Sequence, residues 1–338
     1  MKLAVAALIR NEIDIVGAFL QHLDALFDHV LLIDHGSIDG TDRVMAQACA
    51  GRPGWTLWHL DPVGYHQAAF SRFALGHLMR GTDADIVMFL DADEFIAVPD
   101  RTTLEASFAR LAGPDYIGRL LWRDVVPERL DTRAIRPGEA IWRAPATSSL
   151  GKVVISRLFY AAHGHEAHLA LGNHGLYYLP DRVVPSGIVG EISHLPIRSH
   201  TQLTGKVLAG VLSLMAQADR SPAQGRHWQD ILGRIADGTL RDDDLIGFAA
   251  HYSEDGGQAA QPLSWADLQA GGFTRSFLYV AFGRPLPAVS EKPALDPVRL
   301  MATILRRFHI EDVRNSALVL EGDRLRFAPR AASVDTAP

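Results

Sequence analysis

The chain has 338 residues, of which 48% are hydrophobic and 21% charged, with a formal net charge of −6 and a pI near 6.2. This composition excludes disordered and fibrous chains, and the acidic balance argues against a surface that binds nucleic acid by neutralising phosphates. The single cysteine, Cys49, excludes an internal disulfide and any metal site built from several cysteines.

The chain contains no segment with the pattern of a secretory leader or a membrane span. The first apolar run, residues 3–9, is followed at once by Arg10 and Glu12, so it is too short for a leader with a cleavage site. The next longest candidate, around residues 207–216, falls short of the ~18 apolar residues of a spanning helix. We expect a cytoplasmic protein, and peripheral contact with the inner face of a membrane stays open.

The first hundred residues alternate two kinds of apolar pattern. Short, wholly apolar runs predict strands that are buried on both faces of a sheet, and a mostly apolar run predicts one more: residues 3–9, 30–33 and 86–90 for the first kind and 55–60 for the second. Apolar residues at helical spacing predict helices between them: residues 13–27, 43–50 and 67–79. This alternation predicts an α/β fold with a Rossmann-like sheet, whose ligands bind at the carboxyl ends of the strands.

The remainder of the chain has a different pattern. Shorter β-like segments occur between loops: residues 116–122, 153–160 and 175–179. From about residue 201 the chain is mostly helical, with three candidate helices and an end that we expect to be frayed: residues 206–218, 228–236, 298–308 and 330–338. We predict one mixed-sheet domain over 1–200, with a nucleotide-binding half (1–112) and an acceptor half (113–200), followed by a mainly helical region over 201–338.

Asp91 and Asp93 follow the fourth apolar run directly. Two carboxylates at i and i+2 beside a strand end can share Mg²⁺ or Mn²⁺, which proteins commonly hold with one or two carboxylates plus substrate phosphates. Solvated turn acids or helix caps are the alternative, because Asp-x-Asp alone is a weak signal. The position after a buried strand favours a metal site.

Two other polar clusters also follow predicted strands. Asp34 and Asp39 flank Gly36 and Ser37, where carboxylates can accept hydrogen bonds from a ribose or base. A turn with Asp39 as a helix cap is the alternative, and the residues 10–12 have the same ambiguity, since Asn and Glu can cap the helix that follows.

The order and spacing of these three clusters resemble the family 2-like glycosyltransferases. Three stretches carry the resemblance: LIRNE at 8–12, LIDHGSIDGT at 32–41 and FLDADEF at 89–95. The resemblance implies a GT-A fold and a single in-line displacement that inverts the anomeric carbon and needs a general base. It also implies metal ligands and nucleotide contacts, with Asp91 in both sets: Asp91 and Asp93 for the metal, and Arg10, Glu12, Asp34, Ser37, Asp39 and Asp91 for the nucleotide.

Residues 190–199 resemble a C-terminal motif of the same enzymes, in which a histidine precedes Arg-Ser and a helix. By this resemblance His194 would complete the metal shell, and Arg198 and Lys206 would meet the diphosphate. A structural histidine and two solvated helix charges are the alternatives.

Residues 151–157 and 172–175 resemble the lysine-bearing strand and a nearby loop of these enzymes, so Lys152 and His174 are expected to contact the diphosphate or the acceptor. The general base depends on tertiary proximity that spacing does not give. Asp124 and Glu191 are the candidates for it.

We therefore expect transfer of a sugar from a nucleoside-diphosphate donor to a glycan, a lipid-linked sugar or another hydroxyl, as in polysaccharide assembly. A catalytically silent nucleotide-binding scaffold and a nucleotidyltransferase are the alternatives. The latter should have a basic, glycine-rich loop after its first strand, whereas residues 10–14 are acidic overall. Three roles stay open for the C-terminal helices: covering the acceptor site, forming a homodimer and contacting a membrane.

Overall fold

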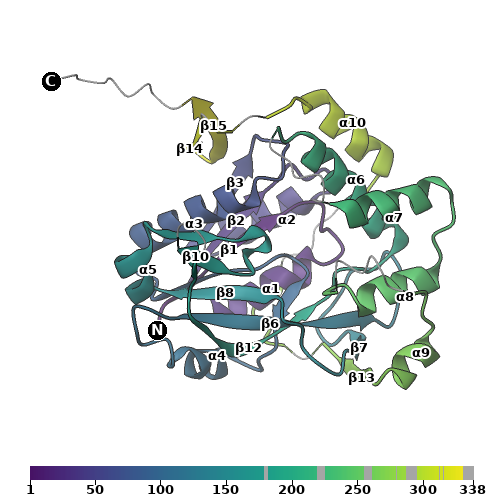
Figure 1. The fold of residues 1–338 in the computed structure, drawn as a ribbon, viewed down its shortest axis with the longest axis horizontal. Coiled ribbons are helices and arrows are strands. Elements are labelled where there is room, and N and C mark those ends of the chain that lie inside the picture. Colours follow the sequence, from purple (N-terminus) through teal and green to yellow (C-terminus); the bar gives the residue numbers. More distant parts are fainter. Residues whose placement is uncertain are drawn as a thin grey trace.

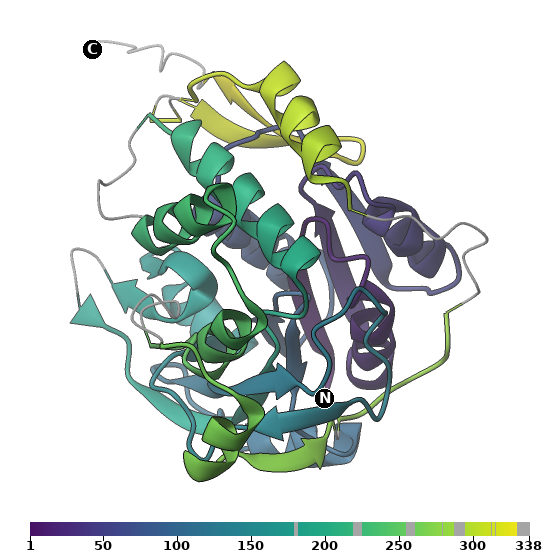
Figure 2. The same cartoon turned by 90° about the vertical axis from the view of Figure 1, so that its right-hand side faces the viewer.

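The computed structural model describes residues 1–178, 182–218, 225–254, 261–278, 280–286, 295–311, 313–314 and 316–329. The fold class is α/β with a mixed central sheet, as the sequence predicts (Figure 1). Helices lie on both sides of that sheet, as Figure 2 shows. The predicted frayed end, residues 330–338, lies outside the described residues.

Four parallel strands form the centre of the sheet in the order β4-β1-β2-β3. Their bounds are β1 (Leu3–Ile9), β2 (His29–Asp34), β3 (Trp55–Leu60) and β4 (Ile86–Phe89). Three helices connect them: α1 (Val16–Leu26), α2 (Thr41–Ala50) and α3 (Gln67–Gly81). The predicted β-α-β order of the first ninety residues is confirmed.

Strand β1 is covered on both faces because its side chains alternate between two cores. Val5 and Ala7 belong to the core that includes α1 and α2, whereas Ala4 and Ala6 belong to the core that includes α3. An apolar residue is therefore needed at every position of this strand, which explains its unbroken apolar run.

The second half of the domain extends the sheet beyond β4. Strand β8 lies antiparallel between β4 and β6, and β6 also pairs with β7 and, in parallel, with β12. The bounds are β5 (Glu94–Ile96), α4 (Arg101–Phe108), β6 (Ile117–Pro127), β7 (Ala140–Arg143), β8 (Gly151–Ser156) and β12 (Ser186–His194). A separate three-stranded sheet contains β9 (Ala167–Leu169), β10 (Leu176–Tyr178) and β11 (Arg182–Val183), with the short helix η1 (Leu171–Asn173) between β9 and β10.

The prediction of β structure over 153–160 is wrong in its second half. Strand β8 ends at Ser156, whose hydroxyl accepts a hydrogen bond from the backbone N–H of Phe159 at 3.1 Å. This cap starts helix α5 (Arg157–His163). The apolar residues 158–160 therefore belong to a helix.

The C-terminal region is helical but also returns to the sheet. Its helices are α6 (His200–Met215), α7 (Arg226–Ala236), α8 (Asp242–Ala250), α9 (Trp265–Ala270) and α10 (Pro297–Arg307). Strand β13 (Thr274–Phe277) pairs with β7, and the hairpin of β14 (Ser316–Glu321) and β15 (Arg324–Pro329) pairs with β3. The strands that follow residue 200 therefore belong to the same sheet as the strands before it, so the sheet continues across the predicted boundary. Among the described residues, no helix is long and apolar enough to cross a membrane.

Glu311 fastens the segment after α10 to the loop after β3. Its carboxylate accepts hydrogen bonds from the backbone N–H of Val63 at 2.7 Å and of Gly64 at 3.0 Å, and it lies 2.8 Å from Nε2 of His66. Burial would raise the pKa of Glu311, but these donors lower it below its ordinary value. The carboxylate thus positions a loop that leads into α3.

We expect Glu311→Ala to lower the free energy of unfolding by about 2 kcal/mol, because two buried backbone N–H groups lose their acceptor. Urea unfolding would measure it. Glu321→Ala is the matched control, since Glu321 forms an exposed pair with Arg326 and its loss should change little. Equal effects of the two substitutions would contradict this role.

Candidate functional site

A cavity of about 410 Å³ lies where the carboxyl ends of β1 and β4 face helix α6. Its wall carries charged and aromatic side chains from segments far apart in the sequence: Arg10, Glu12, Tyr65, Asp91, Asp93, Trp122, His174, His194, Lys206, Trp228 and Tyr252. A larger cavity of about 700 Å³ lies between α3, α5 and the β14–β15 hairpin, but no acidic side chain of the described residues lines it. The chemistry is therefore concentrated in the smaller cavity.

The turn between β4 and β5 presents Asp91 and Asp93 to this cavity. The N–H of Glu94 donates to the carbonyl of Asp91 at 3.0 Å, and the N–H of Leu195 donates to the carbonyl of Asp93 at 2.8 Å. The side chain of Glu94 folds back and accepts a hydrogen bond from the N–H of Asp91 at 2.9 Å. Local backbone bonds and strand β12 therefore fix both carboxylates in place.

Lys152 neutralises one side of the turn. Its ammonium group lies 2.6 Å from Asp91 and 3.3 Å from Glu94, and it also donates to the carbonyl of Gly172 at 2.8 Å. Burial alone would lower the pKa of Lys152, but Asp91 and Glu94 raise it above its ordinary value. The lysine side chain is fully buried and does not line the cavity. It therefore neutralises the carboxylates from behind the cavity wall.

The carboxyl group of Glu94 joins three neighbours on the Lys152 side of the turn. Besides Asp91 and Lys152, it accepts a hydrogen bond from the indole N–H of Trp122 at 2.7 Å. Burial raises the pKa of Glu94 to about 8, against the opposing effect of Lys152. The carboxyl group thereby orients the Trp122 ring that lines the cavity.

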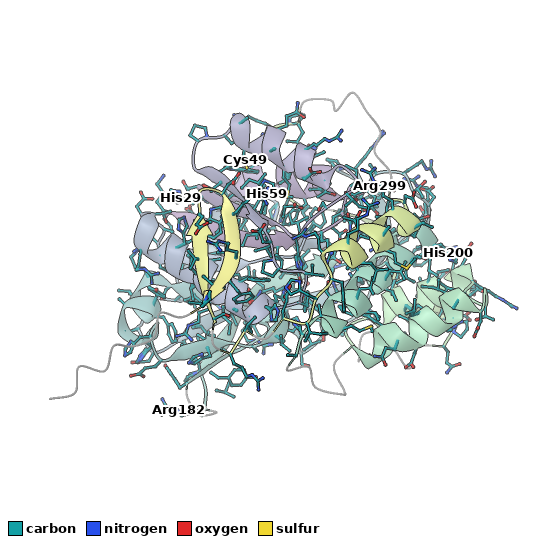
Figure 3. All side chains as sticks on the ribbon, turned by 90° about the horizontal axis from the view of Figure 1, so that it is seen from above. His29, Cys49, His59, Arg182, His200 and Arg299 are labelled. Atoms are coloured by element: carbon teal, nitrogen blue, oxygen red, sulfur yellow. The ribbon has the colours of Figure 1, made fainter. Side chains whose placement is uncertain are left out.

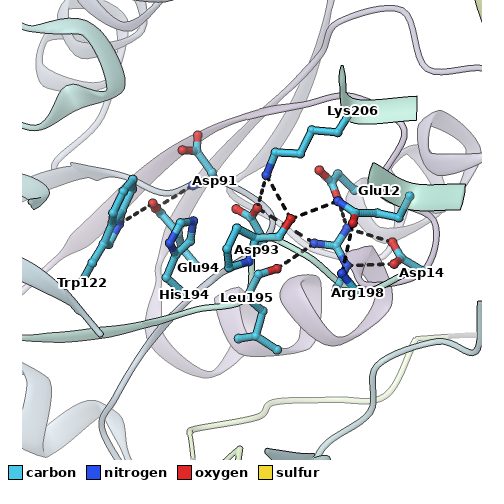
Figure 4. Close-up of polar contacts among 12 residues, drawn as sticks. Glu12, Asp14, Asp91, Asp93, Glu94, Trp122, His194, Leu195, Arg198 and Lys206 are labelled. Atoms are coloured by element: carbon cyan, nitrogen blue, oxygen red, sulfur yellow. Dashed lines mark hydrogen bonds and ion pairs between the residues drawn. The ribbon is translucent and has the colours of Figure 1, made fainter. Parts of the chain in front are cut away.

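Lys206 neutralises the other side of the turn, as Figure 4 shows. Its ammonium group lies 2.8 Å from Asp93 and sits over the ring of Tyr252, 5.2 Å from the centroid. Burial would raise the pKa of Asp93, but Lys206, His194 and Arg198 lower it below its ordinary value. Asp93 is therefore an anion within a buried ion pair, whereas about 34% of the Asp91 side chain stays exposed.

Arg198 links the segments that follow β1 and β12. It donates to Asp14 at 2.8 and 3.0 Å and to the carbonyl of Leu195 at 2.9 Å, and it also pairs with Glu12 (Figure 4). Burial raises the pKa of Glu12 to about 8, partly offset by Arg198. The guanidinium group does not line the cavity. It holds Glu12 at the cavity edge.

Asp124 and His194 form a buried pair beside Trp122. Oδ1 of Asp124 lies 3.5 Å from Nδ1 of His194, and neither atom has a hydrogen-bond partner in the described structure. Oδ2 of Asp124 accepts bonds from the N–H and hydroxyl of Ser253 at 3.0 and 2.6 Å. The imidazole stacks on Trp122 at 4.1 Å and lines the cavity, so Asp124 lies behind it.

The loop after β2 is tied to the loop after β1. Asp34 accepts bonds from the N–H groups of Gly36 and Ser37, and the hydroxyl of Ser37 accepts one from the N–H of Asn11. Asp39 accepts bonds from Ile13 N–H and from Thr41. These polar groups shape the loops beside the cavity but do not line it.

Of the remaining predicted residues, Arg10 and His174 line the cavity and Glu191 does not. Arg10 lines the cavity and donates to the hydroxyl of Ser213 at 2.7 Å, and burial lowers its pKa to about 10. His174 lines it with Nδ1 at 2.7 Å from the carbonyl of Gly151. Glu191 lies apart, paired with Arg123 and Arg143 at 2.7 and 2.6 Å.

The cavity thus gathers some of the predicted site residues and leaves others behind its wall. Those that line it are Arg10, Glu12, Asp91, Asp93, His174, His194 and Lys206. Those that do not are Asp34, Ser37, Asp39, Asp124, Lys152, Glu191 and Arg198. Three residues of the site were not predicted, because they come from segments more than a hundred residues after the Asp91–Glu94 turn: Trp228 and Tyr252, which line the cavity, and Ser253, which binds Asp124.

Within the described part of the chain, no three His, Cys, Asp or Glu side chains are arranged to hold a metal ion. His194 as a third metal ligand stays a prediction. Asp91, exposed in the cavity, and Asp93 next to it still fit a cation that takes its other ligands from phosphate and water.

No family model and no curated protein matched the chain. Similar solved structures include TarS 1–349 of S. aureus, with 12% identity over 75% of this chain and 72% of that chain and a TM-score of 0.33. The mannosyltransferase PcManGT from Pyrobaculum calidifontis, in complex with GDP-Man and Mn²⁺, has 15% identity over 80% and 79% and a TM-score of 0.36. TM-scores below 0.5 show only a weak structural similarity. The fold is therefore assigned from the strand order of this chain and not from these structures.

We expect Lys152→Met to lower the free energy of unfolding by about 3 kcal/mol, because the buried carboxyl group of Glu94 and the partly exposed carboxylate of Asp91 lose their shared cation. In the double variant Lys152→Met/Glu94→Gln, part of this loss should be recovered. Chemical unfolding of both single variants and the double variant would measure the coupling. Strictly additive losses would contradict the charge arrangement, and Lys2→Met, which breaks an exposed pair with Asp28, is the control.

Proposed function

We propose that this chain transfers a sugar from a nucleoside-diphosphate donor to a hydroxyl group, with the donor in the 410 Å³ cavity. The observation that carries the proposal is the exposed carboxylate of Asp91 beside Asp93, at the carboxyl end of a buried parallel strand. Nucleotides bind at this edge of open α/β sheets. The resemblance of residues 8–12, 32–41 and 89–95 to GT-A glycosyltransferases supports the same assignment.

The charges of the site support a need for a divalent cation. Lys152, Lys206 and Arg198 are each paired with carboxylates, so little of their charge is left to offset a diphosphate. Mg²⁺ or Mn²⁺ on Asp91 and Asp93 would, when bound, offset the charge of the leaving diphosphate.

Aromatic side chains suit the sugar and base of such a donor. Trp122, Tyr65 and Tyr252 line the cavity, where aromatic rings can contact the apolar parts of sugars and bases. His194 stacks on Trp122 and Lys206 lies over Tyr252, so a ligand would share these two rings with protein groups. Arg10 and Glu12 supply polar contacts to the nucleotide, and His174 to the diphosphate or acceptor. Lys206, whose charge is matched by Asp93, can still donate a hydrogen bond to the same groups. Asp34, Ser37 and Asp39 act here by holding the two loops in register.

We assign the general base to His194, in place of the metal-ligand role that the resemblance implies for it, and a positioning role to Asp124. A proton on Nδ1 of His194, facing Asp124, leaves Nε2 with the lone pair that can accept the proton of an acceptor hydroxyl. A direct displacement would then invert the anomeric carbon in one step. Glu191 does not fit this role because its carboxylate is held by two arginines outside the cavity.

Neither alternative function has an observation of its own in its favour. A nucleotidyltransferase would hold its phosphates with a basic loop after β1, whereas Glu12 and Asp14 follow that strand here and bind Arg198. A silent scaffold would lack a base beside the donor, whereas His194 lines the cavity. The acceptor is a hydroxyl of a glycan or a lipid-linked sugar in this proposal.

We expect calorimetric titration with UDP, GDP, CDP and dTDP to give binding of one nucleotide that is at least about tenfold tighter with Mn²⁺ than without it. Asp91→Asn should remove most of the metal-dependent gain and leave the metal-free affinity nearly unchanged. Glu166→Gln, an exposed carboxylate far from the turn, is the control. No binding of any nucleotide would favour the silent scaffold.

We expect His194→Gln and Asp124→Asn to keep the donor affinity within about threefold and to lower the release of nucleoside diphosphate from UDP- and GDP-sugars by about 10²-fold or more. The first loses the proton acceptor, and the second loses the group that orients it. Glu191→Gln should turn over at the wild-type rate. The reverse pattern, with only Glu191→Gln inactive, would contradict the assignment of the general base to His194.

A further inference from the structure

Helix α10 carries large apolar side chains on its outward face. Val298, Met301 and Leu305 are 70%, 39% and 51% exposed, and Ile310, just after the helix, is 61% exposed. Positions 298, 301 and 305 follow helical spacing i, i+3, i+7, so the three side chains form one stripe. Scattered exposed apolar residues need no explanation, but a stripe of them on one helix does.

The opposite face of α10 is already used in packing. Leu300 and Ile304 are buried against Ala209 and Ala216 in and after α6. Arg307, an exposed residue on the same side of the helix, donates to the carbonyls of Leu60 and Asp61. The helix is therefore fixed to the protein by one face and presents a second apolar face to the outside.

Two arginines border the exposed stripe. Arg299 and Arg306 are exposed and seven positions apart, so they lie on one line beside Val298 and Leu305. The nearest acidic side chain of the helix, Asp296, caps its N-terminus by accepting bonds from Val298 N–H and Arg299 N–H. In Figure 3, which looks down on α10, Arg299 lies at the outer surface, and none of the helices of the described residues lies over α10.

We propose that α10 docks this protein on a membrane surface that carries anionic lipid headgroups. An apolar stripe bordered by arginines on a helix that lies flat on the protein suits the boundary between headgroups and acyl chains. A second copy of the chain fits less well, because a symmetric contact of this face would bring the same arginines together between two proteins of net charge −6.

Docking through α10 also places the cavity close to the bilayer. Helix α10 packs on α6, and α6 contributes Lys206 and Ser213 to the cavity wall. Helices α10 and α6 would then lie between the membrane and the site. Docking does not depend on the proposed sugar transfer, so a negative vesicle experiment would leave the proposed transfer untouched, and a negative nucleotide titration would leave the docking proposal untouched.

The test is sedimentation of the full chain with vesicles of phosphatidylcholine alone and of phosphatidylcholine mixed with phosphatidylglycerol. The wild-type protein should sediment with the mixed vesicles and much less with the neutral ones. The variant Val298→Ser/Met301→Gln/Leu305→Gln should bind at least about tenfold more weakly. The variant Arg299→Gln/Arg306→Gln should lose most of the preference for the anionic lipid, about fivefold per arginine.

Phe277→Gln is the control, since Phe277 is 63% exposed on β13, away from α10, and its loss should leave vesicle binding unchanged. All variants should keep the wild-type melting temperature, because every substituted side chain is exposed. Wild-type protein that stays in solution with both kinds of vesicle would overturn the proposal. So would a dimer, seen by analytical ultracentrifugation, that the triple apolar variant converts to monomers without any vesicle binding.

Discussion

The buried ion pairs around the Asp91–Glu94 turn are the constraint on which the rest of the site depends. Lys152 and Lys206 approach the turn from opposite sides, and each meets a carboxylate within 2.8 Å. Charges can be buried in a protein interior only when they are paired and hydrogen-bonded. Strand β8, which carries Lys152, and helix α6, which carries Lys206, are therefore both needed to neutralise this turn.

These pairs also define what the cavity can accept. Their cations have their charge satisfied by the protein, and the exposed part of Asp91 adds negative charge at the wall. An anionic group beside Asp91 would be repelled unless a cation accompanies it, because electrostatic interactions are strong in a partly buried site, whereas Arg10 adds positive charge elsewhere on the wall. The aromatic rings of Trp122, Tyr65 and Tyr252 suit the neutral part of such a ligand. The proposed donor, a sugar on a nucleoside diphosphate with a metal ion, combines these properties.

Local sequence patterns predicted the parts of the fold that depend on local physics. Strand β1 and the Asp91–Asp93 turn follow directly from an apolar run and the polar residues after it. The partners of those residues could not be predicted, because they come from distant segments: Lys152 lies 61 positions after Asp91, and Lys206 lies 113 after Asp93. The same holds for Asp124, which the sequence offered as a direct base and which lies behind His194. At 157–160 a single serine cap decided between strand and helix.

A crystal structure of the protein with Mn²⁺ and the nucleoside diphosphate that it binds would test the proposed donor site. We expect an anomalous manganese peak within coordination distance of Asp91, with the diphosphate in the cavity beside His194. A diphosphate bound elsewhere on the chain, or held in the cavity by the lysines with no metal at Asp91, would contradict it.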